Sequence, residues 1–157
     1  MGKYTKILVM VATCLAAAYL GSIATQSSVD TWYKTIEKPV FNPPSWIFAP
    51  VWTLLYIMMG AAAGLVWHRT GRREGVQRAL ILFAIQLALN NLWSFLFFGL
   101  QNPFLALIEI ILLWLLIYET MLAFRRVSTL AGRLLIPYLL WVSFATVLNG
   151  SIWWLNR

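Results

Sequence analysis

The chain contains very little cysteine, histidine and acidic side chain. Among 157 residues it has one cysteine, Cys14, one histidine, His68, and five acidic residues. A single cysteine excludes an intrachain disulfide, and the two residues together exclude a metal site built from several cysteines or histidines. No closely spaced carboxylate pair and no glycine-rich phosphate loop is present. The familiar catalytic signatures are therefore missing, and no bound metal is expected.

Charged residues are scarce as well. They make up 11% of the chain, against about 25% in an ordinary soluble domain. Hydrophobic residues make up 61%, and the length suits one domain. A net charge of +7 would suit nucleic acid, but the basic residues lie between apolar runs and no base-reading element is found. We expect an integral membrane protein with no nucleic-acid partner.

Five apolar segments are long enough to cross a hydrocarbon core of about 30 Å. They are expected near residues 7–25, 46–67, 79–100, 103–124 and 134–155. Backbone groups in lipid must be bonded within the protein, so these segments are predicted to be helices. The predicted fold class is an all-α membrane protein, a five-transmembrane-helix bundle that forms one domain over 1–157. The last helix should bend near its start, at Pro137.

The first segment also has features of a signal peptide, because Lys3 and Lys6 precede an apolar run. That run continues through Ile23 and is too long for a typical signal core, so we expect a retained helix. Only about Gln101–Asn102 separates the third and fourth segments, which predicts a tight antiparallel hairpin.

Basic residues predict the orientation. Nine lie at the N-terminus and in the second and fourth loops, and three lie on the other side. The nine are Lys3, Lys6, Arg69, Arg72, Arg73, Arg78, Arg125, Arg126 and Arg133, and the three are Lys34, Lys38 and Arg157. Positive charge favours the cytoplasmic side, which predicts a cytoplasmic N-terminus in a bacterial cell membrane. The arginines of 69–78 are expected to contact anionic membrane lipid.

The first loop is stiff and aromatic. The stretch from Trp32 to Trp52 holds three tryptophans and four prolines. Proline fixes φ and removes a backbone donor, so most of this stretch cannot be a regular helix. We interpret residues 26–45 as an outward-facing lid, with Trp32, Pro43 and Pro44 as its characteristic residues.

Three predicted helices carry aromatic and amide side chains at helical spacing, in the half of the bundle nearest this loop. They are Trp52 and Tyr56 in the second helix, Gln86, Asn90, Trp93 and Phe97 in the third, and Trp141, Ala145, Leu148 and Asn149 in the fifth. Amides in hydrocarbon are costly unless paired, which leaves two readings. The amides either join helices by hydrogen bonds or line a cavity and meet a ligand. A large apolar cavity with a few polar groups would suit a planar lipophilic ligand stacked on aromatic walls.

Three ionisable residues lie in or beside the spans. Acidic residues within a membrane suggest function by default. Glu119 is placed to reach Arg125 or Arg126, whereas Glu109 lies deeper, where a functional role competes with a protonated or amide-paired structural one. His68 is expected to be solvated at a helix end, with haem ligation as a remote alternative.

Gly60 and Gly64 form a GxxxG pattern in the second predicted helix. Such a pattern lets two helices approach closely, either within the bundle or between two protomers. Both alternatives stay open from the sequence.

The chain resembles the tryptophan-rich sensory protein/translocator protein (TSPO) family, in order and over nearly its whole length. The residues that carry this resemblance are Trp32-Tyr33, Lys38-Pro39, Pro43-Pro44, Trp52, Tyr56, Gln86, Asn90, Trp93, Phe97-Phe98-Gly99, Pro137-Tyr138, Trp141, Ala145-Thr146 and Leu148-Asn149. The short N-terminus looks like that of a bacterial member.

This resemblance implies a five-helix bundle, often a homodimer, that binds porphyrin, haem or other tetrapyrroles under the first loop without a required cofactor. Trp52 and Trp141 match tryptophans that face the ligand in the family. The other implied or predicted wall residues are Tyr56, Asn90, Trp93, Phe97, Ala145, Leu148 and Asn149. Some bacterial members are reported to degrade porphyrin in light, with the two matching tryptophans implicated, so Trp52 and Trp141 are also the candidate catalytic residues.

One departure concerns sterols. Animal members have a motif near the end of the fifth helix that needs a tyrosine, and residues 148–157 contain none. High-affinity cholesterol binding is therefore not expected. The leading hypothesis is a non-enzymatic tetrapyrrole receptor or sensor, and the alternatives are a porphyrin photo-oxidising enzyme and a tetrapyrrole or lipid transporter.

Overall fold

The structure, a computed structural model, describes residues 1–69 and 73–157 and forms an all-α bundle. Its five spans are α1 (Lys3–Gln26), α3 (Ser45–His68), α4 (Arg73–Ser94) with the π-helical turn η1 (Phe95–Gly99), α5 (Pro103–Val127), and α6 (Thr129–Leu134) with α7 (Ile136–Leu155). Each is long and apolar enough to cross a membrane. The predicted five-transmembrane-helix bundle is confirmed.

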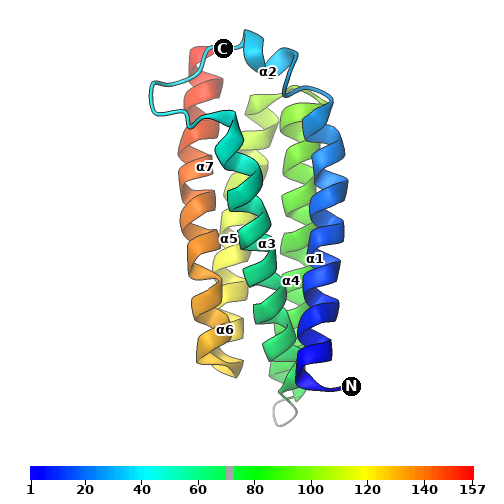
Figure 1. The fold of residues 1–157 in the computed structure, drawn as a ribbon. Helices are drawn as coiled ribbons and strands as arrows, with labels where there is room; N and C mark the ends of the chain where they lie inside the picture. The colour runs from blue at the N-terminus through cyan, green and yellow to red at the C-terminus, as the bar shows by residue number, and fades with distance from the viewer. Residues whose placement is uncertain (70–72) are drawn as a thin grey trace.

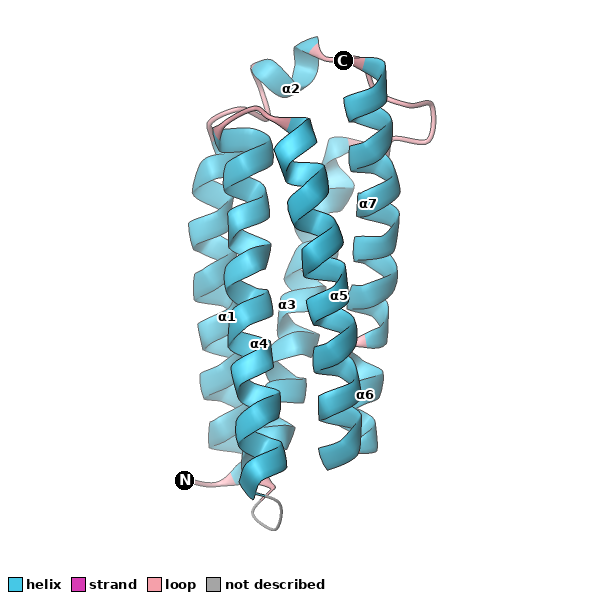
Figure 2. Cartoon of the chain, turned by 180° about the vertical axis from the view of Figure 1, so that it is seen from behind, coloured by secondary structure: helices cyan, strands magenta, loops and turns pink. Residues whose placement is uncertain are grey.

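The spans run up and down and pack side by side (Figure 1). Helix α1 packs against α3 and α4, α5 packs against α4 and α7, and α6 packs against α3. The short helix α2 (Trp32–Thr35) and the C-terminus lie at one end of the bundle, which we call the α2 end, and the N-terminus lies at the other (Figures 1 and 2). The prolines and tryptophans of the first loop are thus gathered at the α2 end.

The helix ends differ from the predicted bounds. Helix α4 begins at Arg73 rather than near residue 79, and α5 continues to Val127 rather than ending near residue 124. The last span is broken at Leu135, two residues before Pro137. That proline lies in the first turn of α7, where a missing N–H leaves no helical hydrogen bond unmade.

The turn between η1 and α5 is as short as predicted, and it uses a left-handed residue. Gln101 has φ 54°, a conformation that few non-glycine residues adopt. The side chain of Asn102 then accepts a hydrogen bond from the backbone N–H of Leu105 and caps α5. These two residues reverse the chain and hold the α4–α5 hairpin together at the α2 end.

Helices α1 and α3 touch backbone to backbone in the half of the bundle away from α2. A Cβ atom on Gly60 would lie 2.4 Å from Cα of Val11, and one on Gly64 would lie 2.5 Å from Cα of Ile7. Both glycines of the GxxxG pattern therefore pack inside one chain. This supports the first of the two readings left open by the sequence.

The first loop is tied to the bundle at two places. The hydroxyl of Ser28 donates to the carbonyl of Phe98 and accepts from the amide of Gln101. Farther along, the Asn156 side chain accepts from the backbone N–H of Glu37 and donates to the Glu37 carbonyl at 2.8 Å. The loop is thereby fastened to the α4–α5 hairpin and to the end of α7.

Of the nine basic residues used to predict the orientation, Arg72 lies outside the described residues, and only the backbone of Arg73 is described. The others lie in α1, near the α3–α4 connection, or around the α5–α6 turn, all at the end opposite α2. Lys34, Lys38 and Arg157 lie at the α2 end (Figure 1). The charge asymmetry of the sequence thus becomes an asymmetry between the two ends of the bundle.

Candidate functional site

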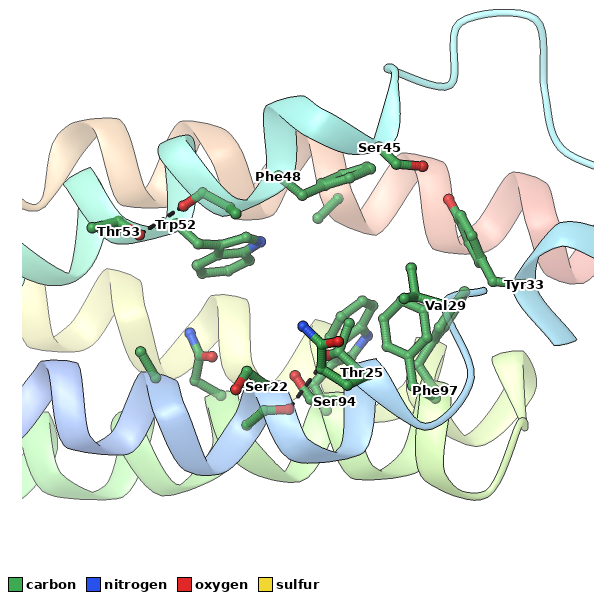
Figure 3. Close-up of a pocket in the computed structure, with 18 of the residues that line it drawn as sticks. Ser22, Thr25, Val29, Tyr33, Ser45, Phe48, Trp52, Thr53, Ser94 and Phe97 are labelled. Atoms are coloured by element: carbon green, nitrogen blue, oxygen red, sulfur yellow. Dashed lines mark hydrogen bonds between the residues drawn. The ribbon is translucent and has the colours of Figure 1, made fainter. Parts of the chain in front are cut away.

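A cavity of about 650 Å³ lies inside the α2 half of the bundle. Its walls come from α1, α3, α4 with η1, and α7, and residues of the first loop lie at its α2 end. Figure 3 shows Trp52 on α3 facing Ser22 and Thr25 on α1 across this space. The aromatic side chains that line it are Tyr19, Tyr33, Trp46, Phe48, Trp52, Tyr56, Trp93, Phe97, Phe98, Trp141 and Phe144.

Trp52 is the centre of an aromatic cluster on one wall. Its ring centroid lies 5.7 Å from that of Tyr56, 6.3 Å from that of Tyr138 and 6.4 Å from that of Trp141. The rings of Trp52 and Trp141 are nearly perpendicular, at 87°. Phe48 in turn packs edge-on against Trp141. Edge-to-face contacts of this kind stabilise an aromatic wall.

A second aromatic wall comes from the end of α4. The rings of Trp93 and Phe97 stack with centroids 5.0 Å apart, and Phe97 is nearly fully buried. Phe97 and Phe98 lie in the π-helical turn η1, whose wider winding changes the directions of side chains relative to an α-helix. Phe97 and Phe98, which are adjacent in this turn, both line the cavity. The sequence pattern did not predict the π-helical turn.

Two amides and two tyrosines form one hydrogen-bonded chain across three helices, and two of the four, Tyr56 and Asn90, also line the cavity. Tyr56 of α3 donates to Asn90 of α4, which donates to the hydroxyl of Tyr138 of α7. Tyr138 donates to Gln86, and each of these three bonds measures 2.7 Å. All four side chains are buried. Buried amides with good partners hold helices together, which is the first reading of the polar stripe.

Asn149 makes a similar connection closer to the α2 end. Its side-chain oxygen accepts from the indole N–H of Trp93 at 2.9 Å, and its nitrogen donates to the carbonyl of Pro103 at 2.9 Å. It therefore links α7 to α4 and α5, and it also lines the cavity. The indole Nε1 of Trp141, in contrast, is buried without a partner among the described residues.

All nine residues predicted as ligand-binding lie on the cavity wall. They are Trp52, Tyr56, Asn90, Trp93, Phe97, Trp141, Ala145, Leu148 and Asn149. The predicted lid residues Trp32, Pro43 and Pro44 are not among the lining residues that the structure describes. Trp32 instead packs edge-on against Phe97, and Pro44 precedes the first residue of α3.

The contribution of α1 was missed. Ala18, Ser22, Thr25 and Val29 line the cavity at steps of 4, 3 and 4 residues, which is one helical face continued into the loop. The hydroxyls of Ser22 and Thr25 donate to backbone carbonyls of the preceding turn, so their hydrogen bonds are made within α1. Small and hydroxylated residues at helical spacing were the available signal, and they are inconspicuous in an apolar helix.

The open side of the cavity lies between α1 and α3. Its exposed lining residues in the spans are Leu15, Tyr19 and Gln26 on α1, and Ser45, Trp46, Ala49 and Thr53 on α3. Tyr19 is 69% exposed and Trp46 74% exposed. Gln26, Ser45 and Trp46 lie where these two helices meet the first loop, so the opening extends to the α2 end of the bundle, and we call that part its mouth.

The two acids of α5 have different surroundings. Glu119 is exposed, and no ion pair between it and Arg125 is present among the described residues. Glu109 is buried, and neither of its oxygens has a hydrogen-bond partner in the part of the chain that the structure describes. The amide-paired role considered for Glu109 is therefore absent. His68 is the exposed last residue of α3, where solvent reaches it.

We expect the isosteric change Glu109→Gln to leave the thermal stability of the purified protein unchanged or to raise it. An unpaired buried carboxyl is held neutral, so the neutral amide, which has nearly the same shape, removes neither a charge pair nor a hydrogen bond. Thermal unfolding in detergent checks this, with the exposed Glu119→Gln as the matched control. A fall in melting temperature of several degrees for Glu109→Gln alone would show that the carboxyl has a partner in the membrane.

Comparison with known proteins gives a consistent match. The model of the TspO/MBR family matches residues 10–155. The chain is 50% identical over 143 residues to the tryptophan-rich protein TspO of Chlorobaculum tepidum, with 91% of this chain and 90% of the relative covered. It is 40% identical to the tryptophan-rich sensory protein of Cereibacter sphaeroides, covering 95% and 90% of the two chains. It is 39% identical to the translocator protein of Homo sapiens, covering 86% and 80%.

Proposed function

This chain belongs to the TspO/MBR family and is an integral multi-pass membrane protein, and on that basis we propose that it is a receptor that binds porphyrins and related tetrapyrroles in the cavity. The observation that carries the proposal is the set of tryptophans from three different helices, Trp52, Trp93 and Trp141, around one cavity of about 650 Å³. A porphyrin is a flat ring with apolar faces, and aromatic walls suit such a ring. Pockets of roughly 300–1,000 Å³ commonly hold a molecule of this kind.

The test is a titration of the purified protein with protoporphyrin and with haem in darkness. A ring among three tryptophans will quench their fluorescence, and we expect quenching that saturates at one ligand per chain. Free tryptophan amide in the same detergent is the control for collisional quenching and inner-filter effects. Quenching that follows this control without saturation would refute the proposal.

A second candidate is the oxidation of bound porphyrin by dioxygen in light. It is favoured by the closeness of Trp52 and Trp141, whose centroids lie 6.4 Å apart, and by the buried, unpartnered Nε1 of Trp141. This candidate requires a product different from that of the free dye, formed only with the protein, light and oxygen together. Transport is the third candidate, and it requires net tetrapyrrole flux across sealed vesicles that contain the protein.

The proposal also covers the membrane in which the protein lies, its orientation there and its oligomeric state. We place the protein in a bacterial cell membrane with the N-terminus in the cytoplasm, because the basic residues gather at the end opposite α2. The α2 end, with the mouth of the cavity, then faces outward. A homodimer is also proposed, from the family resemblance alone, and cross-linking in membranes tests it.

We expect the lid variant Pro43→Gly, Pro44→Gly to weaken porphyrin binding several-fold and to change the melting temperature little. Glycine frees the backbone just before α3, the helix that carries Trp46, Phe48 and Trp52, whereas the bundle contacts lie deeper. Binding and thermal unfolding are measured on the same preparation.

Asn156→Leu gives an independent way to loosen the loop, because it removes both hydrogen bonds to the Glu37 backbone. It should weaken binding in the same direction as the double glycine variant. Normal affinity in both variants would make the loop a connector rather than a lid.

A further inference from the structure

The charge on the cavity wall is unusual for a site that takes an acidic ligand. Among the lining residues that the structure describes, Asp30 is the one charged residue, and its charge is negative. The protein as a whole carries a net charge of +7. A porphyrin with propionates would therefore meet no positive partner inside the cavity.

An unpaired carboxylate is too costly to bury in such a place. Moving a charge from water into an apolar site is unfavourable unless a partner and hydrogen bonds replace the water. The Asp30 carboxylate adds repulsion for any acid that enters beside it. A ligand with carboxylates on one edge must therefore keep that edge outside, at the mouth.

Three basic side chains lie at the α2 end, and two of them have structural roles. The ammonium of Lys38 donates to the carbonyls of Tyr33 and Ile36 and lies 4.8 Å from the centroid of the Tyr33 ring. The guanidinium of Arg157 lies 3.5 Å from the centroid of Trp154, at the end of α7. Neither contacts a charged residue of the cavity wall.

Lys34 differs from these two. Its ammonium lies 3.6 Å from the carboxylate of Asp30, four residues earlier in the chain, and the two side chains are 69% and 78% exposed. Asp30 is an exposed lining residue in the loop at the α2 end, so its partner Lys34 lies beside the mouth of the cavity without lining it. Exposed pairs of this kind contribute little to stability, which means that another carboxylate can replace Asp30 as the partner of Lys34.

We propose that Lys34 is a specificity-determining residue that binds the carboxylate edge of a planar amphiphilic ligand, while Asp30 keeps acidic groups out of the cavity. This assignment rests on the proposed tetrapyrrole-binding function. It defines a ligand class: flat, apolar over most of the ring, and acidic on one edge. Rings with carboxylates on every side do not fit, because some of those charges would be buried.

The experiment compares protoporphyrin with its dimethyl ester, which has the same ring and no charge. Dissociation constants are measured in darkness at low salt for the wild type and for Lys34→Gln, Lys34→Arg, Asp30→Asn and the control Lys3→Gln, whose site lies at the opposite end. We expect Lys34→Gln to weaken protoporphyrin binding about twofold to fivefold and to leave binding of the ester unchanged. Lys34→Arg should retain the affinity for protoporphyrin, and Asp30→Asn should increase it. Added salt should weaken the binding of protoporphyrin and leave the binding of its dimethyl ester unchanged.

The outcomes separate the two proposals. If the wild type binds neither porphyrin, the tetrapyrrole-receptor proposal fails and the Lys34 assignment fails with it. If the wild type binds both porphyrins and Lys34→Gln affects neither, or both equally, the Lys34 assignment is overturned and the receptor proposal stands. An effect of Lys3→Gln equal to that of Lys34→Gln would also overturn the Lys34 assignment, because attraction by the protein's net charge would then explain the loss of affinity.

Discussion

Replacing Trp52 and Trp141 together by alanine is expected to weaken protoporphyrin binding about a hundredfold. Each stacked or edge-on aromatic contact contributes about 1.4 kcal/mol, and each such increment is a tenfold change in affinity. Both rings lie on the cavity wall and contact each other, at 6.4 Å between centroids. The loss of affinity in the double variant should therefore exceed the loss in either single variant. Comparing the wild type, both single variants and the double variant gives the coupling energy between the two tryptophans.

The matched control is Trp154→Ala, which removes an exposed tryptophan at the end of α7 outside the described cavity lining. Affinity is measured through porphyrin absorbance rather than tryptophan fluorescence, since the variants change the number of fluorophores. Circular dichroism confirms the helix content. Normal affinity in the double variant would place the binding site elsewhere on the protein.

The second large effect is expected on folding, from Gly60→Ala combined with Gly64→Ala. The added methyl groups would meet backbone atoms of Val11 and Ile7 at 2.4 to 2.5 Å, and backbone cannot move aside as a side chain can. Helices α1 and α3 must then separate, at a cost of about 1–3 kcal/mol per site. We expect a fall in melting temperature of many degrees, or loss of the folded protein from detergent extracts.

Gly150→Ala is the control for this change. It is also a glycine within a helix, but its added methyl would lie 3.7 Å from the Leu107 side chain, an ordinary contact. Alanine should therefore be neutral there or stabilise by up to about 1 kcal/mol, since it favours helix. Equal behaviour of the two variants would contradict the close packing of α1 on α3.

The fold could be predicted because it depends on chemistry that is local in the sequence. Each of the five apolar runs predicted one helix, and the basic residues between them predicted which ends lie together. The spacing of Gln86, Asn90 and Trp93 predicted one face of one helix. The same spacing predicted that Trp52, Asn90 and Trp141 share one region, and all three line the cavity, whereas Gln86 of the same stripe does not. Helix bounds were less accurate, because Arg73 and Val127 extend helices beyond the apolar runs into polar sequence.

What could not be predicted depends on contacts between distant segments. The sequence leaves open whether Asn90 meets a ligand or another helix, and only the positions of Tyr56 and Tyr138 settle its hydrogen bonds. The pairing of Gly60 with Val11 is likewise a property of two helices. The α1 wall was missed because Ser22 and Thr25 are small, and the π-helical turn at Phe97 leaves no periodic signal.

The most direct test of the central claim is an experimental structure of the protein with protoporphyrin bound, determined in darkness. We expect ring density inside the cavity, against Trp52, Trp93 and Trp141, with both carboxylates at the mouth beside Lys34. Ring density on the membrane-facing surface, with the cavity lacking porphyrin, would contradict it.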